Sequence, residues 1–183
     1  MPSSNSMSAW PAFNWVRATD GYEMSVTRND WISVHNCLEF ESRQLRDMLE
    51  LWRSKCTGDR LPSRTDFDLC ELKSHMGWLV LVDVERDPQR FLYRLIGSNI
   101  TGLADRDVTG KYFDELYDAE TASAATSSYR RVVESRRPTR VNASLHHASK
   151  GHLTFEAIDL PLSNDGTRVD MILVRCVYDI EKS

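Results

Sequence analysis

The feature that most constrains this chain is a pair of short apolar segments separated by a turn signal. Trp78–Val84 is apolar apart from Asp83, and Phe91–Ile96 follows it after a short polar interval that contains Asp87-Pro88. Apolar runs of this length, bounded by turn residues, are typical of β-strands rather than of helices. The two segments therefore predict a β-hairpin, and the fold of this chain must include an antiparallel sheet.

The segments after this hairpin alternate between helical and strand patterns. Residues 98–117 are rich in turn residues and predict short helices, whereas residues 118–136 predict one longer helix that Pro138 ends. Further strands are predicted at Val141–His147, Leu153–Leu162 and Val169–Tyr178, the last two joined by the hairpin signal Asn164-Asp165-Gly166. Two strands, a helical crossover and three strands predict an α+β fold, with one antiparallel sheet and helices on one face.

An amphipathic helix is predicted at Leu38–Lys55, ahead of the sheet. Its apolar residues recur at three- and four-residue spacing and form a narrow stripe, and basic residues fill its last turn as the helix dipole prefers. A narrow stripe suits pairing with a second copy, so a homodimer is one expectation. Packing on the helix's own domain is the other. The candidate interface residues are Leu38, Leu45, Met48, Leu49 and Trp52.

Three regions are expected along the chain. Residues 1–36 show no sustained period and predict an N-terminal tail that is partly disordered or docks through its aromatic residues. Residues 37–60 are expected to hold the amphipathic helix and a linker, and residues 61–183 the α+β domain.

Composition and charge exclude several classes of protein. The 183 residues include 23 Lys and Arg against 27 Asp and Glu, a net charge of −4, whereas a nucleic-acid-binding domain is usually strongly basic. The longest apolar stretch, residues 77–84, falls far short of the ~20 residues that a membrane-spanning helix needs. The first residues lack the features of a signal peptide, and the cysteines are too widely spaced for a zinc site or a disulfide framework. A cytoplasmic protein without nucleic-acid or membrane partners is expected.

Five segments, taken in order, resemble the PAS domain superfamily, and more narrowly the stand-alone bacterial PAS domains that open with an L-P-x-R-x-D-F-D motif. The segments are Leu61–Asp68, which carries that motif, Leu81–Glu85, Phe91–Gly97, Arg106–Leu116 and Leu160–Gly166. The resemblance implies a PAS-like, five-stranded antiparallel sheet in the order 2-1-5-4-3. It also implies a pocket beneath short helices that serves in sensing and partner contact.

The pocket implied by the resemblance is expected to hold a small ligand of unknown identity rather than flavin or haem. Flavin sensors of the superfamily need a cysteine after the second strand, and haem sensors usually use a histidine of the long helix; residues 98–103 and 118–137 lack these residues. No metal site is expected, because adjacent His146 and His147 point to opposite faces of a strand and, with His152, lack a further ligand at a recognised spacing. The candidate ligand-binding residues are Tyr93, Tyr129, His147, Phe155 and Met171.

The resemblance implies a sensory or regulatory module that signals through a dimer interface and a downstream protein, since no output segment is recognisable in the chain. A ligand-free adaptor for protein–protein interaction is the alternative. A less favoured candidate is an enzyme with a ketosteroid-isomerase-like cone fold, which would need Asp83, Glu156 or Asp170 as its buried acid. Nucleotide-binding and serine-hydrolase motifs are absent, so we expect a protein that is not an enzyme.

Overall fold

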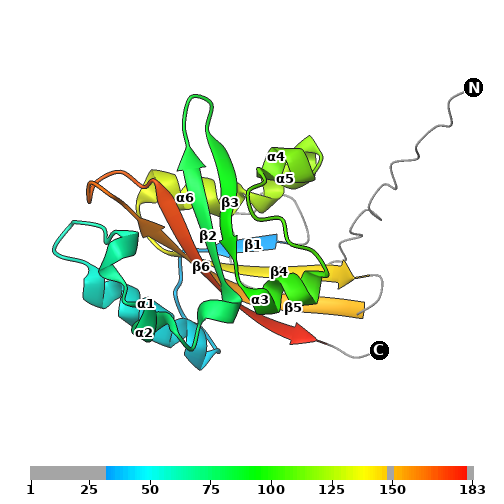
Figure 1. The fold of residues 1–183 in the computed structure, drawn as a ribbon, viewed down its shortest axis with the longest axis horizontal. Coiled ribbons are helices and arrows are strands. Elements are labelled where there is room, and N and C mark those ends of the chain that lie inside the picture. Colours follow the sequence, from blue (N-terminus) through cyan, green and yellow to red (C-terminus); the bar gives the residue numbers. More distant parts are fainter. Residues whose placement is uncertain (1–31, 148–150, 181–183) are drawn as a thin grey trace, which may run out of the picture.

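The computed structural model describes residues 32–147 and 151–180 (Figure 1). The first half of this range contains β1 (Ile32–His35), α1 (Arg43–Lys55), the 3-10 turn η1 (Arg64–Asp66), α2 (Leu69–Leu72), the 3-10 turn η2 (Met76–Trp78), β2 (Leu79–Glu85) and β3 (Arg90–Ile96). The second half contains α3 (Ser98–Ala104), α4 (Phe113–Leu116), α5 (Ala119–Ala125), α6 (Ser127–Ser135), β4 (Thr139–His147), β5 (Gly151–Leu162) and β6 (Met171–Ile180).

The six described strands form one antiparallel sheet in the order β1-β4-β5-β6-β2-β3. The five strands predicted from the sequence lie within it in the expected neighbour order, from β3 through β2, β6 and β5 to β4. The predicted count is wrong, because β1 adds a sixth strand beside β4, with Ile32 opposite Ala143. The sequence places these residues in the predicted tail, since a strand of four residues leaves almost no periodic signal. The rest of the predicted tail lies outside the described residues.

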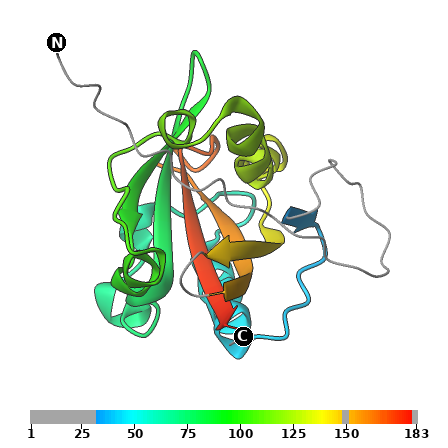
Figure 2. The same ribbon diagram turned by 90° about the vertical axis from the view of Figure 1, so that its right-hand side faces the viewer.

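Helices cover both faces of the sheet, not one face as the sequence predicts. Every residue of β5 from Ala157 to Leu162 is buried, although successive side chains of a strand point to opposite faces. α6 covers the face that carries Asp159, here called the inner face, because Ser128 hydrogen-bonds to Asp159. α1 packs on β5 and β6 from the opposite side, the outer face. Figures 1 and 2 show α1 and α2 on one side of the sheet, and α4 and α5 on the other.

The N-terminal helix α1 begins at Arg43 and not at Leu38, so Leu38 lies outside it. Arg46 reaches back to donate hydrogen bonds to the carbonyl oxygens of Phe40 at 2.5 Å and Glu41 at 2.8 Å. Phe40 itself is buried in the core. These contacts hold the segment before the helix in an irregular conformation. The helix therefore begins later than the apolar pattern of the sequence predicts.

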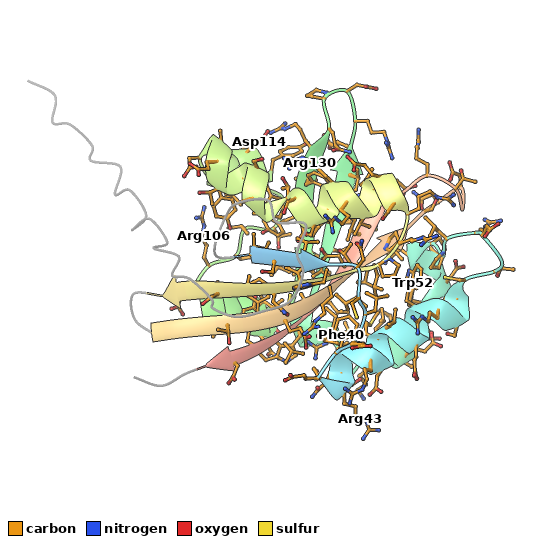
Figure 3. The ribbon with its side chains drawn as sticks, turned by 180° about the vertical axis from the view of Figure 1, so that it is seen from behind. Phe40, Arg43, Trp52, Arg106, Asp114 and Arg130 are labelled. Atoms are coloured by element: carbon orange, nitrogen blue, oxygen red, sulfur yellow. The ribbon has the colours of Figure 1, made fainter. Side chains whose placement is uncertain are left out.

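The apolar stripe of α1 lies in the chain's own core. Leu45 is 0% exposed and Trp52 is 7% exposed. The Trp52 indole N–H donates to the carbonyl oxygen of Pro161 in β5 at 2.9 Å, and Figure 3 shows Trp52 turned toward the sheet while Arg43 points away from it. α1 therefore packs on its own domain, which is the second of the two expectations. The apolar stripe that was a candidate dimer interface is covered by the outer face of the sheet. The stripe residues buried in this way are Leu45, Met48, Leu49 and Trp52.

The helix predicted over residues 118–136 is divided into α5 and α6. The division falls at Thr126, whose backbone angles (φ −94°, ψ 2°) leave the helical region and whose hydroxyl donates to the carbonyl oxygen of Ala122 at 2.7 Å. Asp118 caps α5 by accepting a hydrogen bond from the Thr121 N–H at 2.9 Å. The break lets α6 follow its own direction, with Tyr129 buried against the sheet.

The segment 61–68 is fastened to the loop between β5 and β6. The Leu61 N–H donates to the carbonyl oxygen of Gly166 at 2.9 Å, and the Pro62 carbonyl accepts from the Ser163 N–H at 2.9 Å. Asp68 caps α2 through its side chain. The L-P-x-R-x-D-F-D motif therefore has a structural role here, since it joins α1 and α2 to the sheet.

Candidate functional site

Aromatic side chains gather on the inner face of the sheet beneath α4 and α6. Tyr93 of β3 stacks on Phe113 of α4 with ring centres 4.1 Å apart, and Phe113 meets the ring of Tyr129 edge-on at 5.5 Å. Tyr178 of β6 packs against Phe155 of β5 with ring centres 5.2 Å apart. We call this set, with Tyr117, the aromatic cluster. Such ring pairs add to stability beyond the area they bury.

The hydroxyl groups of the aromatic cluster remain protonated at physiological pH. Burial raises the pKa of Tyr93 and of Tyr178 well above the ordinary value for tyrosine. The hydroxyls of Tyr93 and Tyr117 share a hydrogen bond, and the Tyr178 hydroxyl shares one with the sulfur of Cys176. Burial also raises the pKa of the Cys176 thiol to about 12. The cluster therefore offers neutral polar groups rather than charges.

Three members of the aromatic cluster combine a partly exposed side chain with a buried hydroxyl group. Tyr93, Tyr117 and Tyr178 keep part of their surface accessible. Burial nevertheless raises the pKa of each of them, because protein atoms surround the hydroxyl. Both observations hold for a side chain whose hydroxyl group lies among protein atoms while another part of the ring reaches the surface.

Among the described residues, one carboxyl group, that of Asp159 in β5, is buried on the same inner face. It is 1% exposed. The Thr139 hydroxyl of β4 lies 3.5 Å from its Oδ2, and Ser128 of α6 also hydrogen-bonds to it. Burial raises the pKa of Asp159 to about 7, and the two hydroxyl contacts offset only part of that rise. Near neutral pH this carboxyl group is therefore divided between its protonated and ionised forms.

The structure brings three of the five candidate ligand-binding residues to one face. Tyr93, Tyr129 and Phe155 lie on the inner face within the aromatic cluster. Met171 does not join them: it lies opposite Asp83 and Leu162, on the outer face, because it is an odd number of residues from Cys176 along β6. The backbone of His147 belongs to β4, opposite Gly151, but its side chain lies outside the described part of the protein.

The acids considered for a cone-fold enzyme all have other roles. Asp83 binds Arg94 at 2.7 Å and Glu156 binds Arg140 at 2.6 Å. The Asp170 carboxylate accepts from the Asn164 N–H at 2.9 Å. The buried acid, Asp159, is not one of these three, although the sequence carries a signal for it: Asp159 is the single charged residue in the otherwise apolar run of residues 157–162.

A hollow of about 440 Å³ lies on the outer face of the sheet beside the start of α1. Its lining includes the cross-strand neighbours Ser33, Asn142 and Glu156, with Glu41 from the segment before α1. Arg140 also lines it and is held by Glu156. Most of the residues that line this hollow are polar or charged, whereas the inner face carries the aromatic cluster.

Two kinds of site were sought among the described residues, a metal-ligand cluster and a membrane-spanning helix. Within residues 32–147 and 151–180, no group of three or more His, Cys, Asp and Glu side chains comes close enough to hold a metal ion. No helix in the same ranges has the length and apolar character needed to cross a membrane.

Comparison with known proteins identifies one family. A family model described as "PAS domain" matches residues 40–174. The match begins at Phe40, so it includes α1 as well as most of the sheet. No curated protein matches the chain.

Proposed function

Because the chain belongs to the PAS domain family, we propose that it is a cytoplasmic sensory module that binds a small ligand on the inner face of its sheet. The observation that carries this proposal is the position of Tyr93, Tyr117 and Tyr178, which keep accessible surface deep in the fold. Aromatic rings with neutral hydroxyls suit a small aromatic or apolar ligand that carries a few polar groups.

Signalling would pass through the helices that cover the inner face. A ligand can shift the protein only by binding one arrangement of these helices better than another. We propose that α4, α5 and α6 adopt the two arrangements, and that a second copy of the chain or a downstream protein recognises the change. A dimer would use a surface other than the apolar stripe of α1, because that stripe is already buried.

We further propose that the chain has no enzymatic activity of its own. The family match favours the PAS fold over the cone fold, and the acids weighed for catalysis hold Arg94, Arg140 and a backbone N–H. Turnover on a panel of small carbonyl compounds would contradict this proposal.

Native mass spectrometry of the freshly purified full chain tests the ligand. We expect a mass excess that is lost on denaturation, and we expect the double variant Tyr93→Phe, Tyr117→Phe to retain less of it. Tyr112→Phe is the matched control, because Tyr112 hydrogen-bonds to Glu85 on the exposed surface. A chain that carries no bound molecule, and whose melting temperature does not respond to a set of aromatic fragments, would count against ligand sensing.

A ligand-free adaptor is the second candidate, and exposed apolar side chains favour it. Leu69 is 68% exposed, and Met76 and Leu95 are about half exposed. Exposed apolar side chains of this size can serve as contacts for a partner protein. For an adaptor, Leu69→Gln and Leu95→Gln are expected to weaken self-association in analytical ultracentrifugation, while Tyr93→Phe has no effect. If a ligand alters self-association and these variants do not, the adaptor is excluded.

A further inference from the structure

The environment of Asp159 differs from that of the ion-paired acids described above. The described groups that face it are Ser128 and Tyr129 from α6, Thr139 from β4 and Cys176 from β6. All four are neutral, and among the described residues no Lys, Arg or His contributes to the ionisation of this carboxyl group. Arg175, in the neighbouring strand, lies opposite Ile158 and therefore on the outer face. The carboxylate form of Asp159 is thus buried without a cation.

The contacts of Asp159 also connect two layers of the fold. Ser128 belongs to the first turn of α6, and Thr139 belongs to β4, so the carboxyl group bridges the helical cover and two adjacent strands. Ser128 is 2% exposed and Thr139 1% exposed, so water does not reach the bridge while α6 is packed. A charge on Asp159 can gain water only if α6 moves away from the sheet.

We propose that Asp159 is a proton-binding site that controls how tightly α6 packs on the sheet. With the carboxyl group protonated, α6 remains packed and the bridge is uncharged. When the proton leaves, the carboxylate favours states in which α6 is displaced and water enters. The regulatory ligand is the proton itself, so this inference goes beyond the proposed function and does not depend on a bound small molecule.

The direction and range of the pH effect follow from the pKa of Asp159 in the packed and displaced states. In the packed state the pKa of Asp159 is about 7. In a displaced state that admits water, the pKa returns toward the ordinary value of about 3.9. The equilibrium constant for displacement then rises about tenfold per pH unit between about pH 4 and pH 7, and levels off above pH 7. Over the whole range the increase is roughly a thousandfold, and between pH 6 and pH 7 it is about fivefold.

Hydrogen–deuterium exchange of the α6 amides in the full chain, corrected for intrinsic exchange at each pH, tests the proposal. We expect protection of Ser127–Ser135 to decrease as the pH rises from 4.5 to 7 and to remain constant above it. Asp159→Asn is expected to abolish this dependence. Asp114→Asn is the matched control, because Asp114 is an exposed acid bound to Arg90, and it is expected to retain the wild-type dependence.

Two results would overturn the proposal: protection of α6 in the wild type that does not change with pH, or the same dependence in Asp159→Asn. Should that variant fail to fold, the wild-type chain provides a separate measurement. Its aspartate side-chain carboxyl carbons can be titrated by NMR, and we expect one of them to titrate near pH 7. Titration of every aspartate near pH 4 would exclude the proton site.

Discussion

The two faces of the sheet bury ionisable groups of opposite sign at neighbouring positions. Asp159 on the inner face lies opposite Val174, and Arg175 on the outer face lies opposite Ile158, one residue away on each strand. Arg175 is 4% exposed, and its Nε donates to Nδ1 of His75 at 3.2 Å. Neither Asp159 nor Arg175 has an oppositely charged partner among the described ion pairs.

This difference means that the two faces respond to opposite changes of pH. Burial raises the pKa of Asp159, so the inner face is most stable when the carboxyl group is protonated, and it loses stability as the pH rises from about 4 to about 7. Burial and the nearby Arg175 lower the pKa of His75, so the outer face requires neutral His75 and loses stability as the pH falls below about 6.5. A rise in pH therefore destabilises the inner face, and a fall in pH destabilises the outer face.

The largest expected effect is a pH-independent loss of stability from the outer face. Trp52→Ala removes a buried ring and the hydrogen bond to Pro161, and should lower the free energy of unfolding by about 4 kcal/mol. Urea unfolding at pH 5 and pH 8 should give the same loss. A loss that differs strongly between the two pH values would show that α1 packing is linked to one of the buried ionisable groups.

A gain of comparable size, but confined to higher pH, is expected from the inner face. Asp159→Asn keeps the shape of the side chain and removes its ionisation, which penalises the fold by up to about 4 kcal/mol when the pKa rises from its ordinary value to about 7. The variant should therefore unfold at a higher urea concentration than the wild type at pH 8, and the gain should diminish toward pH 4. If the free energy of unfolding varied with pH in the same way in the variant and the wild type, ionisation of Asp159 would not be the source of the pH dependence.

A smaller effect is expected at His75. His75→Asn retains an acceptor for Arg175 but cannot be protonated. Protonation of His75 would cost the wild type the hydrogen bond with Arg175, worth about 1 kcal/mol. Urea unfolding between pH 7 and pH 5 should show a smaller loss in the variant. If the variant lost as much stability as the wild type between pH 7 and pH 5, the group that responds to acid would not be His75.

The smallest effect is expected where the outer face meets solvent. Asp83→Asn breaks the ion pair with Arg94, whose side chain is largely exposed, so the loss should not exceed about 1 kcal/mol. The loss should shrink further in 1 M salt, because ions screen an exposed pair. A larger loss in the free energy of unfolding that does not change with salt would mean that this pair is shielded from solvent.

Much of the sheet could be predicted from the sequence, because strand signals depend on local pattern. The hairpin at Asp87-Pro88 and the segments that form β4, β5 and β6 each carry their own apolar run or turn residues. β1 could not be found in this way, since a strand of four residues is too short to leave a periodic signal. The partner of the α1 stripe was also undetermined, because apolar residues at helical spacing suit a second helix and a sheet equally well.

The candidate site was predicted less completely, for reasons that particular residues make clear. Tyr93, Tyr129 and Phe155 share the inner face. The alternation of side chains along the strands is consistent with this for Tyr93 and Phe155, and the apolar stripe of the helix for Tyr129. Met171 was misplaced because the register of β6 had not been fixed, and a shift of one residue changes the face. Asp159 is not among the sequence-predicted site residues, because its burial depends on α6, which covers that position from a distant part of the chain.

The pairing of β1 with β4 has a consequence for how other chains can approach. A free edge strand invites addition of a further strand, and with it unwanted aggregation. Here the β4 edge is occupied by a strand of only four residues, and at the opposite edge the backbone of Tyr93 exchanges hydrogen bonds with Gly110 and Lys111. Within the described residues both margins of the sheet are thereby blunted, which disfavours the addition of a partner strand along either edge.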